Sequence, residues 1–251
     1  MKKKIIGLIP TRLGSTRLPK KALLEINNLP LIIHTYRRAK LSKLLDEVVI
    51  CCDDQKILNI AKKYKAKAIL TSSNHNNGTE RICEAYEKLD KEFDYILDIQ
   101  GDEPLISPIH IDKVINCHQQ NSNYDIILPT LKTKSLINHN VIKVITNLKN
   151  EVLYLSRAQI PFEFKSKNSF IKKHLSIISF KPTALKKFAL HKKTPLEKIE
   201  DVELLRALEI GMTIKSLNLI GDSFSVDVMD DYEKAKKQII KDKFFKLYVE
   251  N

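Results

Sequence analysis

Short apolar runs alternate, over the first hundred residues, with longer segments whose apolar positions recur at helical spacing. Short runs of this kind are typical of buried strands, and apolar residues three and four positions apart are typical of helices packed on one side. The alternation predicts an α/β fold, with a doubly wound, mostly parallel sheet covered by helices on both faces. Strands are predicted at residues 5–9, 47–52, 68–71 and 95–99, and helices at 31–40, 55–64 and 80–89.

The alternation changes after about residue 129. Two neighbouring strands are predicted at 141–146 and 152–155, with a turn between them. The region from about 130 to 190 is therefore expected to add a small antiparallel lobe to a single domain that spans residues 1–251. Further along the chain we expect an apolar run at 175–180, a helix at 196–208, a strand at 213–219 and a basic helix at 230–248.

Composition supports a folded domain, because 251 residues of which 43% are hydrophobic can bury a full core. The formal net charge is +13 and the isoelectric point about 9.4. Lysines are scattered along the chain instead of gathering on one element with interleaved aromatics, which favours a generally basic surface that attracts anionic substrates. We therefore expect no nucleic-acid partner, with a nucleic-acid-binding protein as the alternative that the charge suggests. The four cysteines show no CxxC spacing and are expected to be core thiols.

The start of the chain shows only a faint similarity to a signal peptide. Lysines at 2–4 precede the apolar run 5–9, but this run is too short and Pro10 interrupts it. No stretch of the sequence reaches the roughly 20 apolar residues that a membrane span needs. We therefore expect a cytoplasmic protein that does not contact a membrane.

The loop that follows the first predicted strand is rich in positive charge. Arg12, Arg17, Lys20 and Lys21 lie within ten residues, together with Ser15 and a glycine. Ligands of open α/β sheets bind at the carboxyl ends of strands, and guanidinium and ammonium groups can surround a triphosphate. The loop matches neither common phosphate-binding fingerprint. A triphosphate site and a solvated basic loop are therefore both open.

Asp102 follows the apolar strand 95–99 and a glycine. An aspartate just past a strand can hold Mg²⁺ through one or two oxygens while phosphates supply the rest. A simple turn that begins at Gly101 is the alternative. Asp227, near the end of the chain, is a candidate second ligand, but only the fold can bring it to Asp102.

Two further segments have the character of helix starts. Thr79 is predicted to cap a helix after the tight turn at Gly78. Asp230 is predicted to cap the C-terminal helix, since acidic residues favour helix N-termini. Taken alone, neither segment indicates a ligand.

Several segments follow one another from residue 9 to residue 231 in the order of a known family: IPTRLGSTRLPKKAL, NNGTER, DIQGDEPLI, LYLSRAQIP, KKHLSI, TPLEKIEDVELLRALE and SVDVMDD. In these segments the chain resembles the 3-deoxy-manno-octulosonate (Kdo) cytidylyltransferases, or CMP-Kdo synthetases. The resemblance implies a nucleotide-diphospho-sugar transferase type of fold, a smaller dimerisation lobe and a homodimer. It further implies transfer of CMP from CTP to an acidic sugar, with release of pyrophosphate.

The resemblance also implies the roles of individual residues. Asp102 and Asp227 would hold Mg²⁺, and Lys21 and Arg17 would offset charge on the departing pyrophosphate, so that Lys21, Arg17 and Asp102 form the catalytic group. No residue is identified as a dedicated general base. The CTP phosphates would contact Arg12, Ser15, Arg17 and Lys21, the nucleoside would contact Gly78, Thr79, Arg81 and Gln100, and the sugar acid would contact Arg157, His174 and Glu203.

The departures from the family pattern fall mainly on the sugar side. Ile178 stands where the family has a tyrosine and Leu204 where it has a glutamine, whereas Lys20 replaces a glycine on the nucleotide side. Each lost hydrogen bond changes discrimination between acceptors by about 1–3 kcal/mol. The acceptor therefore stays open among Kdo, an amino or deoxy analogue, another 2-keto-3-deoxy acid sugar and a small phosphonate. A non-catalytic CTP-binding protein is the alternative from a different class.

Overall fold

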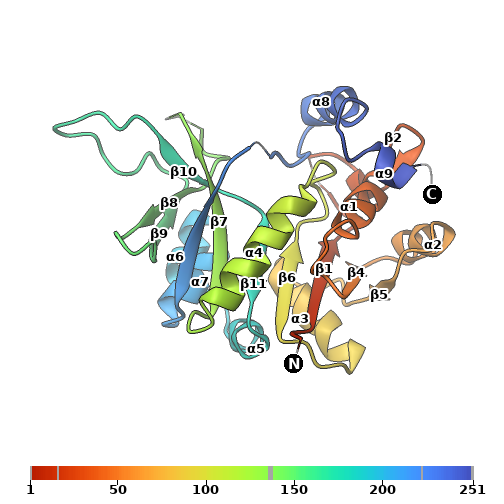
Figure 1. Cartoon of the computed structure of the whole chain (residues 1–251), viewed down its shortest axis with the longest axis horizontal. Helices are drawn as coiled ribbons and strands as arrows, with labels where there is room; N and C mark the ends of the chain where they lie inside the picture. The colour runs from red at the N-terminus through yellow and green to blue at the C-terminus, as the bar shows by residue number, and fades with distance from the viewer. Residues whose placement is uncertain (1, 16, 135–137, 222, 250–251) are drawn as a thin grey trace. The chain divides into compact units, whose positions relative to one another are not determined.

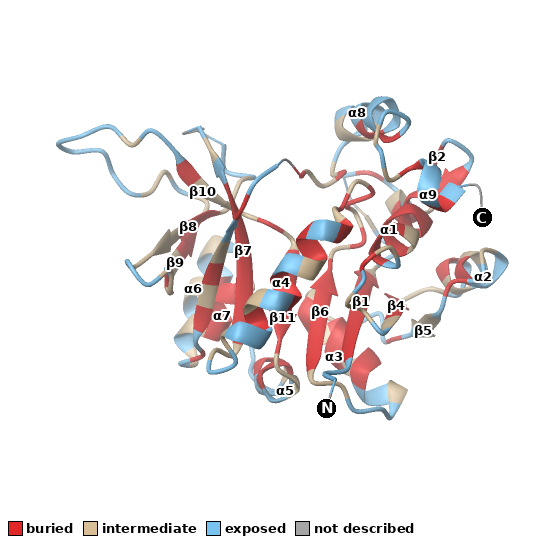
Figure 2. Ribbon diagram, in the orientation of Figure 1, coloured by how far each residue is buried: buried red, intermediate tan, exposed pale blue. Residues whose placement is uncertain are grey.

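A computed structural model describes residues 2–15, 17–134, 138–221 and 223–249 (Figure 1). In it the chain divides into two units. Thr16 of the cationic loop lies outside the described residues. The first unit contains the chain up to Asp112 and again from Ser223 onward, and the second contains the residues between them. Most strand residues in each unit are buried (Figure 2).

The predicted parallel strands are present in the first unit. β1 (Ile5–Thr11) pairs in parallel with β4 (Glu47–Cys52) and with β6 (Tyr95–Ile99), and β4 pairs with β5 (Ala68–Leu70). Every residue of β1 except the last is buried, as expected of a strand covered on both faces. The helices α1 (Leu31–Ala39), α2 (Gln55–Lys63) and α3 (Gly78–Leu89) connect these strands, and a small hairpin joins β2 (Glu25–Ile26) to β3 (Leu29–Pro30).

The single C-terminal helix predicted at 230–248 is wrong. The structure has α8 (Met229–Ile239) and a short α9 (Lys246–Val249) instead. Between them the Asp242 carboxylate accepts hydrogen bonds from the Phe244 amide and the Arg38 guanidinium. These bonds compete with a continuous helix, because the Phe244 amide turns to a side chain instead of a backbone carbonyl.

The second unit has a mixed sheet around β7 (Ile126–Thr133). β12 (Ile214–Leu219) runs parallel to β7, whereas β10 (Ile171–His174) and β11 (Ile177–Phe180) run antiparallel to it. The predicted antiparallel pair is present as β8 (Lys143–Thr146) and β9 (Val152–Ser156), with β8 also paired to β10. Its helices include α4 (Pro108–Gln120), whose first residues belong to the first unit, and α5 (Pro182–Leu190).

The helix predicted at 196–208 is also wrong, because two helices occupy this stretch. α6 (Pro195–Glu200) ends at Asp201, whose φ of 49° is left-handed, and α7 (Leu204–Glu209) begins three residues later. The carbonyl oxygens of Glu200 and Asp201 accept hydrogen bonds from the Arg157 guanidinium. An arginine that follows β9 thus satisfies the carbonyls that end the first helix.

The α/β class and the parallel arrangement of the first strands are confirmed. The region expected to form a lobe, about 130 to 190, lies within the second unit, and its role in dimerisation or sugar binding stays a prediction. In the described part of the chain, no helix has the length and apolar character that crossing a membrane requires.

Candidate active site

The cationic loop leaves the buried strand β1 and ends at a short 3₁₀ helix, η1 (Lys21–Leu23). Arg12, Arg17 and Lys20 are exposed, whereas Lys21 is half-buried. Lys20 has φ 54° and ψ 29°, a left-handed conformation that glycine adopts without strain. A glycine, which the family resemblance implies at this position, would adopt this backbone conformation without strain.

Gly101 allows the turn after β6 to approach the end of β1. A Cβ atom at this position would lie 2.7 Å from the carbonyl oxygen of Pro10, which real side chains do not tolerate. The Thr35 hydroxyl also donates to the Gly101 carbonyl at 3.2 Å. Because of this close approach, Asp102 emerges beside the cationic loop.

Asp102 and Asp227 meet around one ammonium group. Lys21 Nζ lies 2.7 Å from Asp102 Oδ2 and 3.3 Å from Asp227 Oδ1, and Arg17 Nη2 lies 3.0 Å from the same Asp227 oxygen. The side chains of Lys21, Asp102 and Asp227 are 15%, 27% and 30% exposed. The structure therefore brings together the carboxylates that the sequence could only nominate separately.

Hydrogen bonds hold the two aspartate-bearing segments against each other. The Val226 amide donates to the Asp102 carbonyl at 2.9 Å. Glu103, the residue after Asp102, accepts a hydrogen bond at its Oε2 from the Ser223 hydroxyl at 2.6 Å. Glu103 is only 3% exposed. Neither Glu103 nor Ser223 was singled out in the sequence, since their types and spacing carry no signal of this long-range contact.

The N-cap position of α8 is Val228, and Asp231 at the third helical position supplies the capping side chain, so the prediction that Asp230 caps the helix is wrong. Asp231 Oδ2 accepts hydrogen bonds from the amides of Asp227 and Val228, whereas Asp230 is exposed. Ser225 Oγ donates to the second oxygen of Asp227. The cap thus orders the backbone of the proposed metal ligand as well as the helix.

Gly78 and Gln100 are neighbours on the proposed nucleoside side. A Cβ atom on Gly78 would lie 3.1 Å from the Pro10 ring and 3.3 Å from Gln100 Nε2. Asn77, not Thr79, caps α3, because its side-chain oxygen accepts the Glu80 amide at 2.8 Å. Thr79 lies in the first turn and is fully buried, so the prediction of its capping role is wrong.

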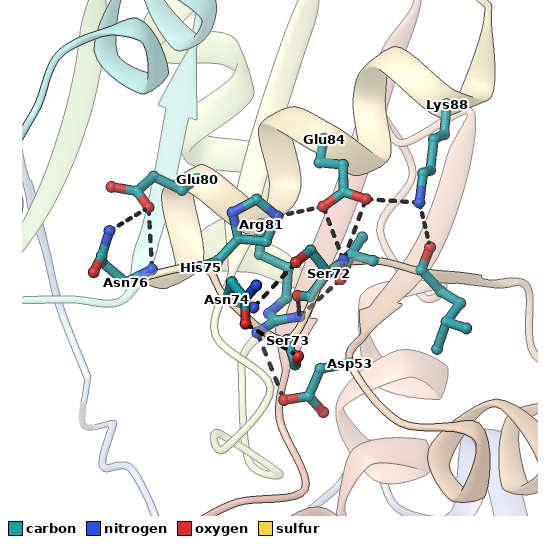
Figure 3. A network of polar contacts seen from close by, with 12 residues as sticks. Asp53, Ser72, Ser73, Asn74, His75, Asn76, Glu80, Arg81, Glu84 and Lys88 are labelled. Carbon is teal, nitrogen blue, oxygen red and sulfur yellow. Dashed lines mark hydrogen bonds and ion pairs between the residues drawn. The ribbon is translucent and has the colours of Figure 1, made fainter.

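Arg81 lies in a network of protein contacts (Figure 3). Its Nη1 donates to Thr71 Oγ1 at 2.7 Å and to the Ser72 carbonyl at 3.0 Å, and its Nη2 lies 3.6 Å from Asp53 Oδ2. The residue is 4% exposed. These contacts show that the guanidinium organises the segment that leads to α3, a role the motif alone did not predict.

Glu84 closes the same network from within α3 (Figure 3). Its carboxylate accepts the Ser72 amide, pairs with Lys88 at 2.6 Å and contacts the His75 ring. Burial raises the pKa of Glu84, but the hydrogen bonds from Lys88, His75 and Ser72 outweigh it and lower the pKa to about 2. The segment between β5 and α3 is therefore tied to a carboxylate that stays ionised at neutral pH.

In the second unit, Arg157 is engaged with backbone carbonyls. Its guanidinium donates to the carbonyls of Glu200, Asp201 and His139 at 2.8, 3.0 and 3.1 Å. The buried Lys143 donates to the Arg157 carbonyl at 2.7 Å. Arg157 thereby holds the connection that leads to Glu203, which stands at the start of α7.

His174 lies at the same end of its sheet as Arg157. Lys173 pairs with Lys143, which in turn pairs with Ser156, so the residues next to them in sequence lie about two strand spacings, roughly 10 Å, apart. Burial, with a smaller effect of Lys173, lowers the pKa of His174 to about 4. The ring is therefore neutral at pH 7 and suited to hydrogen bonding with a hydroxyl.

Comparisons with known proteins show to which family the chain belongs. A family model described as cytidylyltransferase matches residues 6–214. The 3-deoxy-manno-octulosonate cytidylyltransferase of Thermodesulfovibrio yellowstonii is 40% identical over 246 residues, which cover 92% of this chain and 96% of the relative. This chain belongs to the 3-deoxy-manno-octulosonate cytidylyltransferase family. The resemblance seen in the sequence segments is confirmed.

Other members of the 3-deoxy-manno-octulosonate cytidylyltransferase family extend from bacteria to plants. The mitochondrial enzyme of Arabidopsis thaliana is 35% identical, and the match covers 93% of this chain and 82% of the plant protein. A CMP:2-keto-3-deoxy-manno-octonic acid synthetase solved in complex with CTP superposes with a TM-score of 0.90 at 28% identity, covering 95% of this chain and 99% of that one. A 4-diphosphocytidyl-2C-methyl-D-erythritol synthase from Anaerococcus prevotii, with a TM-score of 0.63 and 16% identity over 95% of this chain and 96% of its own, shares the fold.

Two departures from the family pattern lie at buried positions. Ile178 is 2% exposed and Leu204 is 1% exposed. An apolar side chain fits such a position without the hydrogen-bond partner that a tyrosine or glutamine would need. Both replacements therefore leave no buried polar side chain without a partner at these positions.

Proposed function

We propose that this protein transfers CMP from CTP to Kdo and releases pyrophosphate. The observation that carries the proposal is the meeting of Asp102 and Asp227 around Lys21, beside the cationic loop. Family membership, the names borne by the relatives and the CTP complex of a structural neighbour support it. The sugar's anomeric hydroxyl would attack the α-phosphorus of CTP, and the bond to the bridging oxygen of pyrophosphate would break.

Mg²⁺ fits the side chains present in the first unit. Two carboxylate oxygens, each within 3.3 Å of the same ammonium, are a donor set that Mg²⁺ accepts when phosphates and water complete its octahedron. Among the described residues there is no group of three or more His, Cys, Asp or Glu that would form an all-protein cage. Asp102 and Asp227 would hold the ion, which supplies charge neutralisation on the phosphate oxygens.

The protein's own contribution is positioning and charge. Lys21 and Arg17, now paired with the aspartates, can offset negative charge that develops on the departing pyrophosphate. Arg12 and Ser15 would orient the triphosphate in the same loop. The nucleoside would lie near Gly78, Thr79 and Gln100, while Arg81 contributes by ordering the neighbouring segment.

The sugar acid would bind to the second unit. A neutral His174 would exchange hydrogen bonds with a sugar hydroxyl, since it carries no charge at pH 7 to pair with a carboxylate. Glu203 would accept from sugar hydroxyls, and Arg157 would hold its segment in place. Because Ile178 removes one polar group, a Kdo analogue or a small phosphonate is the second candidate for the acceptor.

The assembly and the compartment stay predictions. We propose a homodimer, supported by the exposed aromatic side chains Phe162 and Phe164, each 83% exposed. We also propose a cytoplasmic location, while the Arabidopsis relative carries the word mitochondrial in its name.

The test is pyrophosphate release from CTP, Mg²⁺ and Kdo, with each component omitted in turn. We expect release only with all three, and almost none from Asp102→Asn. Asp230→Asn is the matched control, because Asp230 is exposed at the start of α8, and it should keep wild-type turnover. Wild-type rates for Asp102→Asn would refute the metal assignment.

A panel of acceptors separates the remaining alternatives. Faster release with an amino or deoxy analogue, another 2-keto-3-deoxy acid sugar or a phosphonate would replace Kdo as the acceptor. CTP binding without release from any acceptor would indicate a non-catalytic CTP-binding protein.

A further inference from the structure

Asp53 is a partly buried carboxylate that neither the sequence motifs nor the proposed chemistry uses. It follows β4 directly, and its side chain is 13% exposed. Its Oδ1 accepts the Leu13 amide at 2.9 Å, and its Oδ2 lies 3.6 Å from Arg81 Nη2 (Figure 3). Asp53 therefore contacts both the cationic loop after β1 and the helix that starts at Gly78.

The contacts continue beyond Arg81 to the end of β5. Arg81 Nη1 donates to Thr71 Oγ1 and to the Ser72 carbonyl, and the Thr71 hydroxyl donates to the Cys52 carbonyl at 3.0 Å. The connections that follow β1, β4 and β5 are thus joined through one carboxylate and one guanidinium.

The charges in this chain of contacts depend on each other. Arg81 is 4% exposed, and a buried guanidinium without a nearby anion is strongly unfavourable. A backbone amide that loses its acceptor is also free to move. Removing the whole Asp53 carboxylate should loosen the loop at Leu13 and the segment at Ser72 together, whereas removing only its charge should loosen the segment at Ser72.

We propose that Asp53 is a positioning residue for the nucleotide, which orders the cationic loop and the start of α3 in one geometry before CTP binds. The inference rests on the proposed function for its substrate. An ordered loop spends less conformational entropy when it closes on a triphosphate, so the benefit lies in binding rather than in the chemical step.

Two substitutions separate the contributions of Asp53. Asp53→Asn keeps an acceptor for the Leu13 amide but removes the charge beside Arg81, and Asp53→Ala removes both. We expect the KM and the dissociation constant for CTP to rise about 10-fold in Asp53→Asn and about 30- to 100-fold in Asp53→Ala, with kcat within about 3-fold of wild type.

The neighbouring aspartate provides a matched control. Asp54 caps α2 by accepting the Lys56 amide at 2.7 Å. Asp54→Ala should lower the melting temperature and leave the KM for CTP unchanged. If Asp53→Asn lowers the melting temperature in the same way without weakening CTP binding, Asp53 is merely structural and the inference is wrong.

Amide hydrogen exchange tests the coupling without any activity. Exchange at Leu13 should accelerate in Asp53→Ala and at Ser72 in both Asp53 variants, but at neither residue in Asp54→Ala. Unchanged exchange would overturn the inference whatever the enzyme does. A wild-type protein that binds CTP but releases no pyrophosphate would refute the proposed function, while weaker CTP binding by Asp53→Asn would still support this inference. If Asp53→Ala does not fold, Asp53→Asn decides the question.

Discussion

Replacing Lys21 with methionine tests whether its ammonium competes with a metal ion for the two aspartates. Lys21 bridges Asp102 and Asp227 at 2.7 and 3.3 Å, and methionine keeps most of the side-chain volume while removing the charge. The substitution leaves two carboxylates side by side, and among the described residues Arg17 still pairs with one of them, Asp227.

The structure bounds the size of the effect. Two oxygens at these distances from one nitrogen lie no more than about 6 Å apart. With an effective dielectric constant of about 20 to 80, their repulsion is about 1–3 kcal/mol. Without metal, Lys21→Met should therefore lose about that much free energy of unfolding, a fall of several degrees in melting temperature for a chain of this length.

Added Mg²⁺ should reverse the loss. Because no ammonium has to be displaced, the variant should bind Mg²⁺ alone about 10-fold more tightly than wild type, the equivalent of about 1.4 kcal/mol. The assay is thermal unfolding without CTP over a Mg²⁺ titration. Pyrophosphate release should nevertheless collapse, since Lys21 is proposed to neutralise the leaving group.

Lys20→Met is the matched control. It removes one positive charge from the same loop. Lys20 is exposed, and in the described part of the chain it forms no ion pair with either aspartate. Equal melting temperatures and equal Mg²⁺ responses for the two variants would refute the idea that Lys21 occupies the metal's carboxylates.

Three further predictions address stability. Lys20→Gly should raise the free energy of unfolding by about 0.5–1 kcal/mol in urea titrations, because glycine accepts the left-handed φ of 54° without strain; a loss would contradict this. Ser223→Ala should cost about 1–3 kcal/mol and weaken Mg²⁺ binding, since it removes the 2.6 Å hydrogen bond to the buried Glu103, and a wild-type Mg²⁺ affinity would show that this contact does not position the site. The Glu84 pKa is lowered from 4.5 to about 2 in the folded protein, so the stabilisation by its carboxylate is present above pH 4.5 and is lost as pH falls toward 2. Glu84→Gln should therefore lower the free energy of unfolding at neutral pH by on the order of 2 kcal/mol and reduce its fall between pH 4.5 and 2, measured by unfolding at successive pH values.

The sequence predicted those parts of the fold that depend on local periodicity. The strands β1, β4 and β6 and the β8–β9 pair lie where apolar runs indicated them. These predictions succeed because a strand or helix needs a repeating pattern of buried positions, and that pattern is written in consecutive residues. The family resemblance likewise followed from consecutive residues in the matching segments.

The breaks in helices depended on partners far away in the sequence. A periodic pattern continues through Asp201, but Arg157, which follows β9 directly, donates hydrogen bonds to the carbonyls there. In the same way Arg38 reaches Asp242 and helps to end α8 before α9. A local pattern cannot show which distant side chain will compete with a helical hydrogen bond.

For the candidate site, too, the sequence determined some properties and the tertiary structure determined others. From the sequence alone, the residue types suited to a triphosphate and Mg²⁺ could be named, since charge and donor chemistry belong to each residue. Only the tertiary structure decided that Asp102 and Asp227 share Lys21, and that Asp53 joins Leu13 to Arg81. Such pairings follow from the close packing of β1 against the turn at Gly101 and from long-range backbone contacts. The free energy of these contacts depends on distances between residues far apart in the sequence, and no stretch of consecutive residues specifies those distances.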